Sequence, residues 1–102
     1  MNRLTYQFAW DAAKARSNAA KHGVTFKLAM SVLRDPLALT IFDGEHSDQE
    51  ERWITLGRAA NGQYLVVVHT FEHTSPADVA VRIISARKAD RDEVNDYLNT
   101  PR

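Results

Sequence analysis

A short apolar run followed by a polar segment near the C-terminus limits the possible folds most strongly. Residues 79–84 contain two valines and two isoleucines. Residues branched at Cβ favour strands, and the run is too short for a helix of its own, so it predicts a buried β-strand. Residues 88–98 are polar and favour a helix. The chain is therefore expected to end in a strand followed by a helix.

Three cations lie in or beside this predicted strand: Arg82, Arg87 and Lys88. A guanidinium held rigidly at the edge of a sheet suits a phosphate, because its planar fork donates two parallel hydrogen bonds. The same residues can instead form a solvated strand-to-helix junction, paired to Asp90 or Glu93, since charge clusters usually lie at the surface. The residues alone leave both interpretations open.

The spacing of the two arginines sets a geometric condition. Arg82 and Arg87 are five positions apart, so an unbroken strand would point them to opposite faces of a sheet. A bend or bulge near Ser85 is needed to bring both side chains to one site.

The composition is that of one soluble globular domain, spanning residues 1–102. The contents of apolar and charged residues, 44% and 25%, are ordinary for such a domain. Because the chain has no cysteine, it has no disulfide framework and no thiolate metal site. The longest aliphatic or aromatic run, residues 64–68, is far shorter than the ~20 residues of a membrane span, and the N-terminus has no signal-peptide core. A cytoplasmic protein is the expectation.

Charge is segregated along the chain although the net charge is zero. Residues 1–34 carry six Lys or Arg and one acidic residue, whereas residues 35–53 carry six acidic residues and one arginine. Because the net charge is zero, the chain lacks the overall positive charge that is typical of a nucleic-acid-binding protein. A local basic face, shared by the N-terminal helical region and the C-terminal strand, stays compatible with RNA binding.

Caps, turns and apolar spacing predict eight elements. Asp11 is the expected N-cap of an Ala-rich helix that ends at Gly23, and Thr25 the N-cap of a second helix. Asn61-Gly62 predicts a hairpin, because both residues tolerate positive φ. The expected strands are 5–10, 37–42, 53–58, 63–71 and 79–84; the helices are 12–21, 88–98 and one from 26 to Asp35-Pro36; an acidic loop spans 43–51 and a polar loop 72–78. The order β-α-α-β-β-β-β-α predicts an α+β fold with helices packed on a mainly antiparallel sheet.

Six local patterns, in their order and spacing, resemble the BrnT family of bacterial type II toxins. They are Phe8-x-Trp10-Asp11-x-x-Lys14-x-x-x-Asn18, Lys21-His22-Gly23-Val24-x-Phe26, Asp43-x-x-His46-Ser47, Glu51-Arg52-Trp53, Val67-Val68-His69-Thr70 and Arg82-Ile83-Ile84-Ser85-Ala86-Arg87-Lys88-Ala89. The resemblance covers nearly the whole chain. It implies a RelE-like ribonuclease fold and a toxin that inhibits growth by cutting RNA. By resemblance the cut needs no metal and no cofactor, because the substrate's own 2′-hydroxyl attacks the adjacent phosphate.

The same resemblance implies a partner. This is a BrnA-type antitoxin, which neutralises the toxin and whose ribbon-helix-helix domain binds the operon's own promoter. Toxin and antitoxin are expected to form a heterotetramer that contacts promoter DNA only through the antitoxin, with no membrane involved. The toxin alone is expected to be a monomer, since its sequence has no heptad seam or long apolar edge.

Three residues are the catalytic candidates. Arg87 is expected to stabilise charge on the phosphorane-like state, because residue chemistry and the family pattern converge on it. Arg82 is the second cation. His69 is the acid–base candidate, since imidazole titrates near neutrality, although a hydrogen-bonded histidine at a strand end is an equal alternative.

Lys21, His22 and Lys88 are expected to bind RNA. Lys21 suits a backbone phosphate, while His22 can instead interact with the dipole of its own helix. Members of the family often carry an arginine shortly after the His-Thr pair, but here Glu72 stands in that stretch. A carboxylate near a scissile phosphate would repel it unless the loop points the side chain away.

Two other classes compete with a ribonuclease. A metal-dependent hydrolase would use carboxylates and imidazole of the acidic loop, although a solvated surface loop explains them as well. Its ligands would come from Asp43, Glu45, His46, Asp48 and Glu50. The more serious alternative is a non-catalytic protein-binding module of a toxin–antitoxin-like complex.

Overall fold

The computed structural model describes residues 4–101. Its elements are β1 (Thr5–Ala9), α1 (Ala12–His22), α2 (Phe26–Val32), β2 (Leu39–Phe42), a 3₁₀ helix (Gly44–His46), β3 (Trp53–Arg58), β4 (Tyr64–His69), β5 (Glu72–His73), β6 (Asp78–Lys88) and α3 (Arg91–Asn99). None of the helices in this part of the chain is long and apolar enough to cross a membrane.

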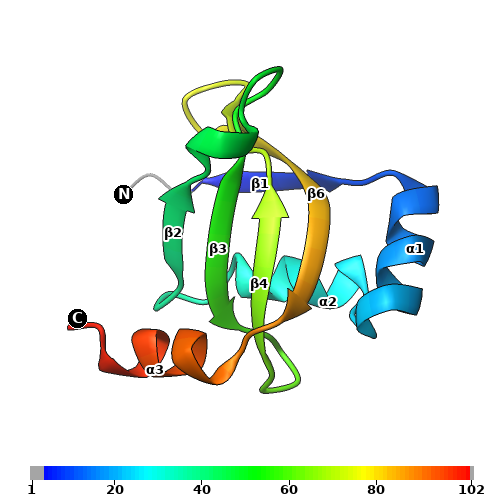
Figure 1. Ribbon diagram of the computed structural model, residues 1–102. Helices are drawn as coiled ribbons and strands as arrows, with labels where there is room; N and C mark the ends of the chain where they lie inside the picture. The colour runs from blue at the N-terminus through cyan, green and yellow to red at the C-terminus, as the bar shows by residue number, and fades with distance from the viewer. Residues whose placement is uncertain (1–3, 102) are drawn as a thin grey trace.

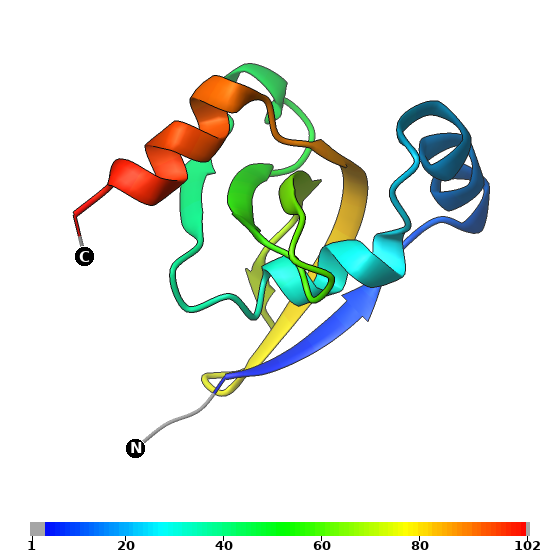
Figure 2. The same cartoon turned by 90° about the horizontal axis from the view of Figure 1, so that it is seen from below.

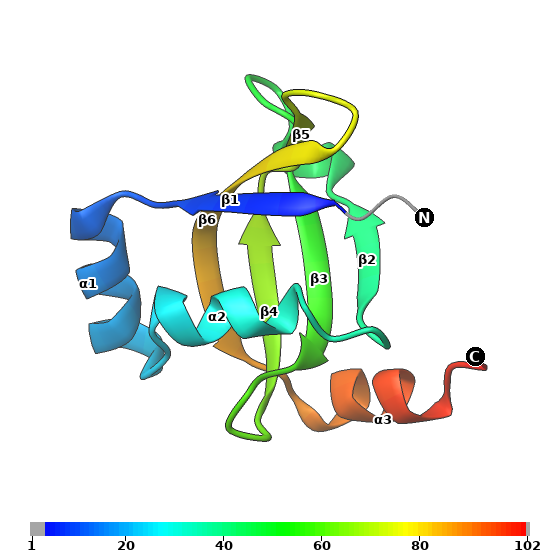
Figure 3. The same cartoon turned by 180° about the vertical axis from the view of Figure 1, so that it is seen from behind.

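Strand β6 joins the two parts of one sheet (Figure 1). The strand order is β1-β6-β4-β3-β2, and β5 also pairs with β6. The first part of β6, residues 78–82, pairs in parallel with β1, and the remainder, residues 83–88, pairs antiparallel with β4. Figures 1 and 3 show β1 running across the direction of β3 and β4, so β6 must bend between its two partners. The predicted α+β fold with a mainly antiparallel sheet is confirmed.

The helices occupy three positions around this sheet. Helix α1 stands beside β6, whereas α2 covers one face and α3 lies on the opposite side (Figures 1 and 2). The predicted caps of the first two helices are confirmed. Asp11 accepts a hydrogen bond from the amide of Lys14, Gly23 adopts φ 67° at the C-terminus of α1, and Thr25 accepts from the amide of Leu28.

Several predicted boundaries were wrong. The loop expected at 72–78 contains β5, which pairs with β6. The last strand continues to Lys88 instead of ending near Ser85, and α3 begins only at Arg91. The reason is local, because the side chain of Asp90 caps the helix in a reciprocal capping box with Glu93. Helix α2 ends at Val32, ahead of the Asp35-Pro36 pair.

The hairpin between β3 and β4 lies where the sequence predicts it, but its turn is different. Within this turn only Gly62 has positive φ, 89°. The amide of Gly62 donates to the carbonyl of Ala59, and the amide of Ala59 donates to that of Gln63. These bonds define a longer loop that needs a single left-handed residue, rather than a two-residue turn that needs two.

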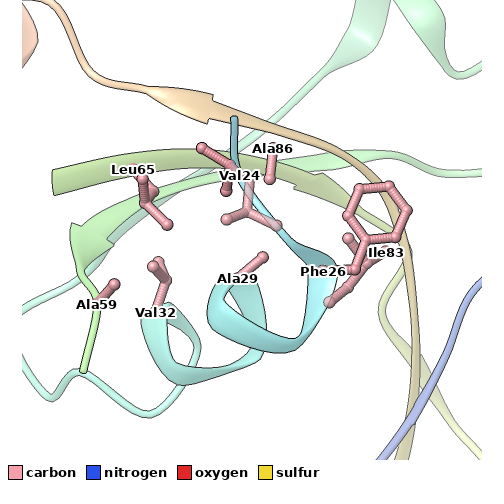
Figure 4. Close-up of a cluster of buried hydrophobic side chains, with 9 residues drawn as sticks. Val24, Phe26, Ala29, Val32, Ala59, Leu65, Ile83 and Ala86 are labelled. Carbon is pink, nitrogen blue, oxygen red and sulfur yellow. The ribbon is translucent and has the colours of Figure 1, made fainter. Parts of the chain in front are cut away.

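The core forms where α2 packs on the sheet. Phe26, Ala29 and Val32 of α2 face Leu65 and Ile83 in Figure 4. These side chains are at most 1% exposed. Each large one contributes about 1.5–3 kcal/mol through burial. The helix therefore fixes one face of the sheet as the interior and leaves the other available for a site.

Gly57 of β3 tests how closely this layer is packed. A Cβ at Gly57 would lie 2.9 Å from Cγ1 of Val32 and 3.1 Å from Cβ of Ala38. We predict that Gly57→Ala lowers the free energy of unfolding by about 1–3 kcal/mol, because overpacking forces neighbouring atoms apart. Urea denaturation measures the change. The matched control is Gly44→Ala, whose nearest contact would be 3.7 Å from a ring carbon of Phe42. Equal stability of the two variants would contradict this packing.

Candidate active site

Strand β6 contains a bulge beside the end of β4. Val68 pairs with Ser85, but the next residue, His69, pairs with Ile83. Ile84 is therefore an extra residue that has no pairing partner on β4. An extra residue of this kind bends the strand and shifts the alternation of its side chains.

The bulge meets the condition set by the spacing of the two arginines. Ile83 and Ala86 are both buried, although they are three positions apart, and Arg82 and Arg87 are both exposed. The extra residue therefore turns both guanidinium groups to the side of β6 that faces away from the core. We call this side the outer face of β6.

Asn18 of α1 holds the bulged segment. The pairing of β1 with β6 ends at Arg82, and beyond it the side chain of Asn18 takes the place of a neighbouring strand. Its Nδ2 donates to the carbonyl of Ala86 at 2.8 Å, and its Oδ1 accepts from the amide of Ala86 at 3.1 Å. Nδ2 also donates to the carbonyl of Val24 at 3.0 Å. Asn18 is only 7% exposed and fixes the backbone next to Arg87.

Arg87 is held by a bidentate ion pair with Glu93 of α3. The two bonds measure 2.7 and 2.8 Å. The hydrogen bond to Glu93 raises the pKa of Arg87 and the same bond lowers the pKa of Glu93, so both groups are charged near neutral pH. The side chain of Arg87 is still 45% exposed. The pairing with Glu93 that the sequence left open is thus present, and the guanidinium fork already holds two oxygens in the arrangement that a phosphate would need.

Arg82 lies in more acidic surroundings. Its guanidinium pairs with Glu50 of the acidic segment, 32 positions away in the sequence. A cavity of about 390 Å³ beside it is lined by Glu50, Glu51, Thr70, Phe71, Glu72 and Arg82. Glu72 therefore lies near Arg82 rather than pointing away, and the carboxylates weaken the attraction of this region for a phosphate.

His69 faces the opposite side of the sheet and is 1% exposed. Its Nδ1 lies 2.9 Å from the carbonyl of Thr70, and its Nε2 lies 2.7 Å from Oγ1 of Thr55. A carbonyl only accepts, so Nδ1 carries the proton and Nε2 accepts from the hydroxyl. Burial lowers the pKa of His69, while the bond to Thr70 acts weakly in the other direction. The structure thus does not bring His69 together with Arg82 and Arg87.

The predicted RNA-binding residues divide between two places. Lys21 and His22 line a groove of about 230 Å³ between α1 and β6, together with Lys14, Asn18, Ile84 and Ser85. Part of the basic N-terminal helix therefore does lie against the bulged part of β6. Lys88 is exposed at the end of β6, one residue after Arg87, and successive strand residues point to opposite faces.

The acidic loop forms a local structure instead of a metal centre. Nδ1 of His46 lies 2.9 Å from a carboxylate oxygen of Asp43. Within residues 4–101, no group of three or more His, Asp or Glu side chains is placed to hold a metal ion. The loop is thus explained by its own hydrogen bonds and by the pair of Glu50 with Arg82.

Asn18 is the residue to which sequence reasoning assigned no role. It belongs to one of the six local patterns that resemble the BrnT family. A polar residue inside an Ala-rich helix was the feature of the sequence that could have indicated a role for it. Its function could not be read from the sequence, because its partner Ala86 lies 68 positions away.

The fold and the family are shown by two comparisons. The crystal structure of the Brucella abortus ribonuclease toxin, BrnT, matches with a TM-score of 0.53 and 22% sequence identity, over 85% of this chain and 100% of that chain. At this identity the match shows a shared fold. A family model described as "Ribonuclease toxin, BrnT, of type II toxin-antitoxin system" matches residues 10–93. No curated protein is similar enough to count as a match.

The chain is therefore a toxin of the type II toxin–antitoxin class. It belongs to the BrnT family of ribonuclease toxins. Membership implies an antitoxin partner and confirms the family resemblance found in the sequence. The RelE-like description of the fold stays a prediction.

The burial of His69 predicts a pH dependence of stability. A histidine whose pKa is lowered in the folded state binds a proton more readily when unfolded, so its contribution is fully present above the unfolded value of ~6.5 and is lost as pH falls through the folded value. We expect the free energy of unfolding of the wild type to fall more steeply below about pH 6.5 than that of His69→Gln, which does not titrate. Urea denaturation between pH 7.5 and pH 5 measures both. Parallel curves would contradict a neutral, buried His69.

Proposed function

We propose that this chain is a metal-independent endoribonuclease whose active site is the outer face of β6. The 2′-oxygen of RNA attacks the adjacent phosphorus and loses its proton, the bond to the 5′-oxygen breaks, and the leaving oxygen gains a proton. Such a reaction needs positioning and charge stabilisation more than a cofactor. The observation that carries the proposal is the bulge at Ile84, which turns Arg82 and Arg87 to one side.

Arg87 is the principal group in this proposal. The hydrogen bonds of Asn18 to Ala86 fix the backbone next to it, and the ion pair with Glu93 orients its guanidinium group. A phosphate arriving at this partly exposed pair would replace the carboxylate and take over both hydrogen bonds. The attraction strengthens as charge builds up on the phosphate oxygens, so Arg87 stabilises the transition state more than the bound substrate.

Arg82 is assigned a supporting role, because the carboxylates of Glu50, Glu51 and Glu72 line its cavity and weaken its attraction for a phosphate. His69, the acid–base candidate from the sequence, faces the opposite side of the sheet, so the outer-face site proposed here does not use it. Both of its ring nitrogens are engaged, Nδ1 by the carbonyl of Thr70 and Nε2 by the hydroxyl of Thr55.

RNA binding is assigned to the groove between α1 and β6. Lys21 and His22 lie there beside Ile84 and Ser85, close along the strand to Arg87. Cations in this groove would hold the sugar-phosphate backbone, and contacts of that kind position RNA without reading its sequence. Lys88 is the third proposed RNA-binding residue, on the face of β6 opposite to Arg87.

The proposed partner is a BrnA-type antitoxin with a ribbon-helix-helix domain, assembled with the toxin as a heterotetramer in the cytoplasm. The toxin alone is proposed to be a monomer. The antitoxin would cover a basic surface most readily with acidic or apolar residues.

The second candidate is a non-catalytic module that only binds the partner. Ile41, Phe42 and Leu98 are 64%, 48% and 60% exposed, which suits a protein interface. The carboxylates around Arg82 also favour this candidate over catalysis. Cleavage of RNA by the isolated chain separates the two.

Arg87 provides the direct test. We predict that Arg87→Gln lowers the rate of RNA cleavage by about 10²–10³-fold, since a preorganised donor to the developing charge is lost. Arg87→Lys should recover only part of it, because a point charge cannot reproduce the bidentate fork. The assay uses purified protein and radiolabelled RNA in excess EDTA.

Arg91→Gln is the matched control, because it removes the same charge from an exposed side chain of α3. It should cleave RNA at the wild-type rate. Full activity of Arg87→Gln, with an unchanged melting temperature, would show that the outer face of β6 is not the site. Loss of wild-type cleavage in EDTA would contradict the metal-independent mechanism.

Glu72 supplies an opposite test. Its carboxylate lines the cavity beside Arg82, so replacing it with a cation should make that region more attractive to RNA. We expect Glu72→Arg to cleave at an equal or higher rate, with tighter RNA binding at low salt that weakens as salt rises. Gel-shift titrations at two salt concentrations measure the binding. Slower cleavage with weaker binding would place Glu72 among the groups that the reaction needs.

A further inference from the structure

A second cavity lies on the side of the sheet that carries His69. It has a volume of about 170 Å³. Tyr6, Phe71 and Val81 form apolar parts of its wall, and the rings of Tyr6 and Phe71 meet edge to face with their centres 6.2 Å apart. The volume is below the roughly 300–1,000 Å³ of pockets for drug-sized ligands, so a single flat ring system fits better than a large molecule.

The polar part of the wall consists of Asp35 and of a chain of hydrogen bonds with a fixed direction. Nδ1 of His69 must donate to the carbonyl of Thr70, which leaves Nε2 as an acceptor for the hydroxyl of Thr55. The single proton of Thr55 is used in that bond. The hydroxyl of Thr40, 2.8 Å away, must therefore donate its own proton to Thr55.

The direction of the chain determines what the cavity can recognise. Thr40 lines the cavity and is exposed, but its proton is committed to Thr55, so it offers only oxygen lone pairs. A ligand must bring a donor to this point. Thr55 and His69 are each 1% exposed, which keeps the arrangement dry and rigid.

We propose that this cavity holds one nucleobase of the RNA substrate and prefers a base with an exocyclic amino group; the proposal rests on the ribonuclease function proposed above. Adenine, cytosine and guanine each carry such a group, which projects two N–H donors beyond the edge of the ring. The one donor of uracil, its N3–H, lies between two carbonyl oxygens that the lone pairs of Thr40 would repel. Unpaired RNA bases are commonly read by aromatic contacts together with hydrogen bonds to their edges. Phe71 also lines the cavity beside Arg82, so the two cavities share this side chain as part of their walls.

Binding of mononucleotides tests the pocket without any cleavage. AMP, CMP, GMP and UMP are titrated into ¹⁵N-labelled protein while the amide signals of Thr40, Thr55 and Phe71 are followed. The three amino-bearing nucleotides should shift these signals, and UMP should bind roughly three- to tenfold more weakly, the equivalent of one hydrogen bond. N-acetylarginine amide is titrated in parallel. Shifts by the arginine alone would overturn the proposal in favour of a protein side chain, and equal shifts by all four nucleotides would overturn the base preference.

Thr40→Val and Thr40→Ser separate the acceptor from the shape of the wall. Thr40→Val keeps the branched side chain but removes the oxygen, so it should abolish the discrimination against UMP. Thr40→Ser keeps the oxygen and should preserve it. Thr74→Val, on an exposed loop residue, is the matched control and should behave as the wild type. Unchanged discrimination in Thr40→Val would overturn the proposal.

Mapping the cleavage products of one mixed-sequence RNA completes the test. The wild type should cut with a preference against uracil at one position near the break, and Thr40→Val should lose that preference. Cleavage without nucleotide binding at the pocket would refute the pocket and leave the ribonuclease standing. Binding at the pocket by a chain that cuts no RNA would refute the ribonuclease and leave the pocket standing.

Discussion

The hydrogen bonds between Asn18 and Ala86 are the constraint on which the outer face of β6 depends. Where β1 ends, the edge of β6 would expose unpaired backbone groups, and the amide of Asn18 satisfies both the N–H and the carbonyl of Ala86. The same side chain reaches Val24 at the turn between α1 and α2. One buried residue thus joins the basic helix α1, the turn that leads into α2 and the bulged strand. The extra residue Ile84 is held beside this point, and the direction of both arginines follows from it.

Each arginine of the outer face is balanced by a carboxylate from another part of the chain. Arg87 has Glu93 of α3 and Arg82 has Glu50 of the acidic segment. Partly exposed pairs of this kind stabilise a fold only weakly, so an incoming phosphate can compete with the carboxylate. The surroundings of the two differ, because Glu51 and Glu72 add to the negative charge near Arg82. This contrast, together with the fixed backbone at Ala86, is why the proposed mechanism centres on Arg87.

Local chemistry made much of the fold predictable. Asp11, Gly23 and Thr25 act within a few residues of their own positions, and their caps were predicted correctly. The hairpin at Asn61-Gly62 was placed correctly, but its form depends on the pairing of Ala59 with Gln63. The sequence set the need for a bulge between Arg82 and Arg87, but whether one exists is decided by the ladder with β4. The pair of Arg82 with Glu50 and the face occupied by His69 are tertiary properties that no local pattern encodes.

The exchange of Glu93 for a phosphate at Arg87 is the central claim, and the guanidinium signals of Arg87 test it most directly. The protein is labelled with ¹⁵N and titrated with an RNA whose 2′-hydroxyl groups are replaced by hydrogen, so that it binds but cannot be cut. The account predicts that the Nε–H signal of Arg87 shifts with a saturable dependence on the oligonucleotide, and that Glu93→Gln tightens binding. An Arg87 signal that stays fixed while other parts of the protein respond would contradict it.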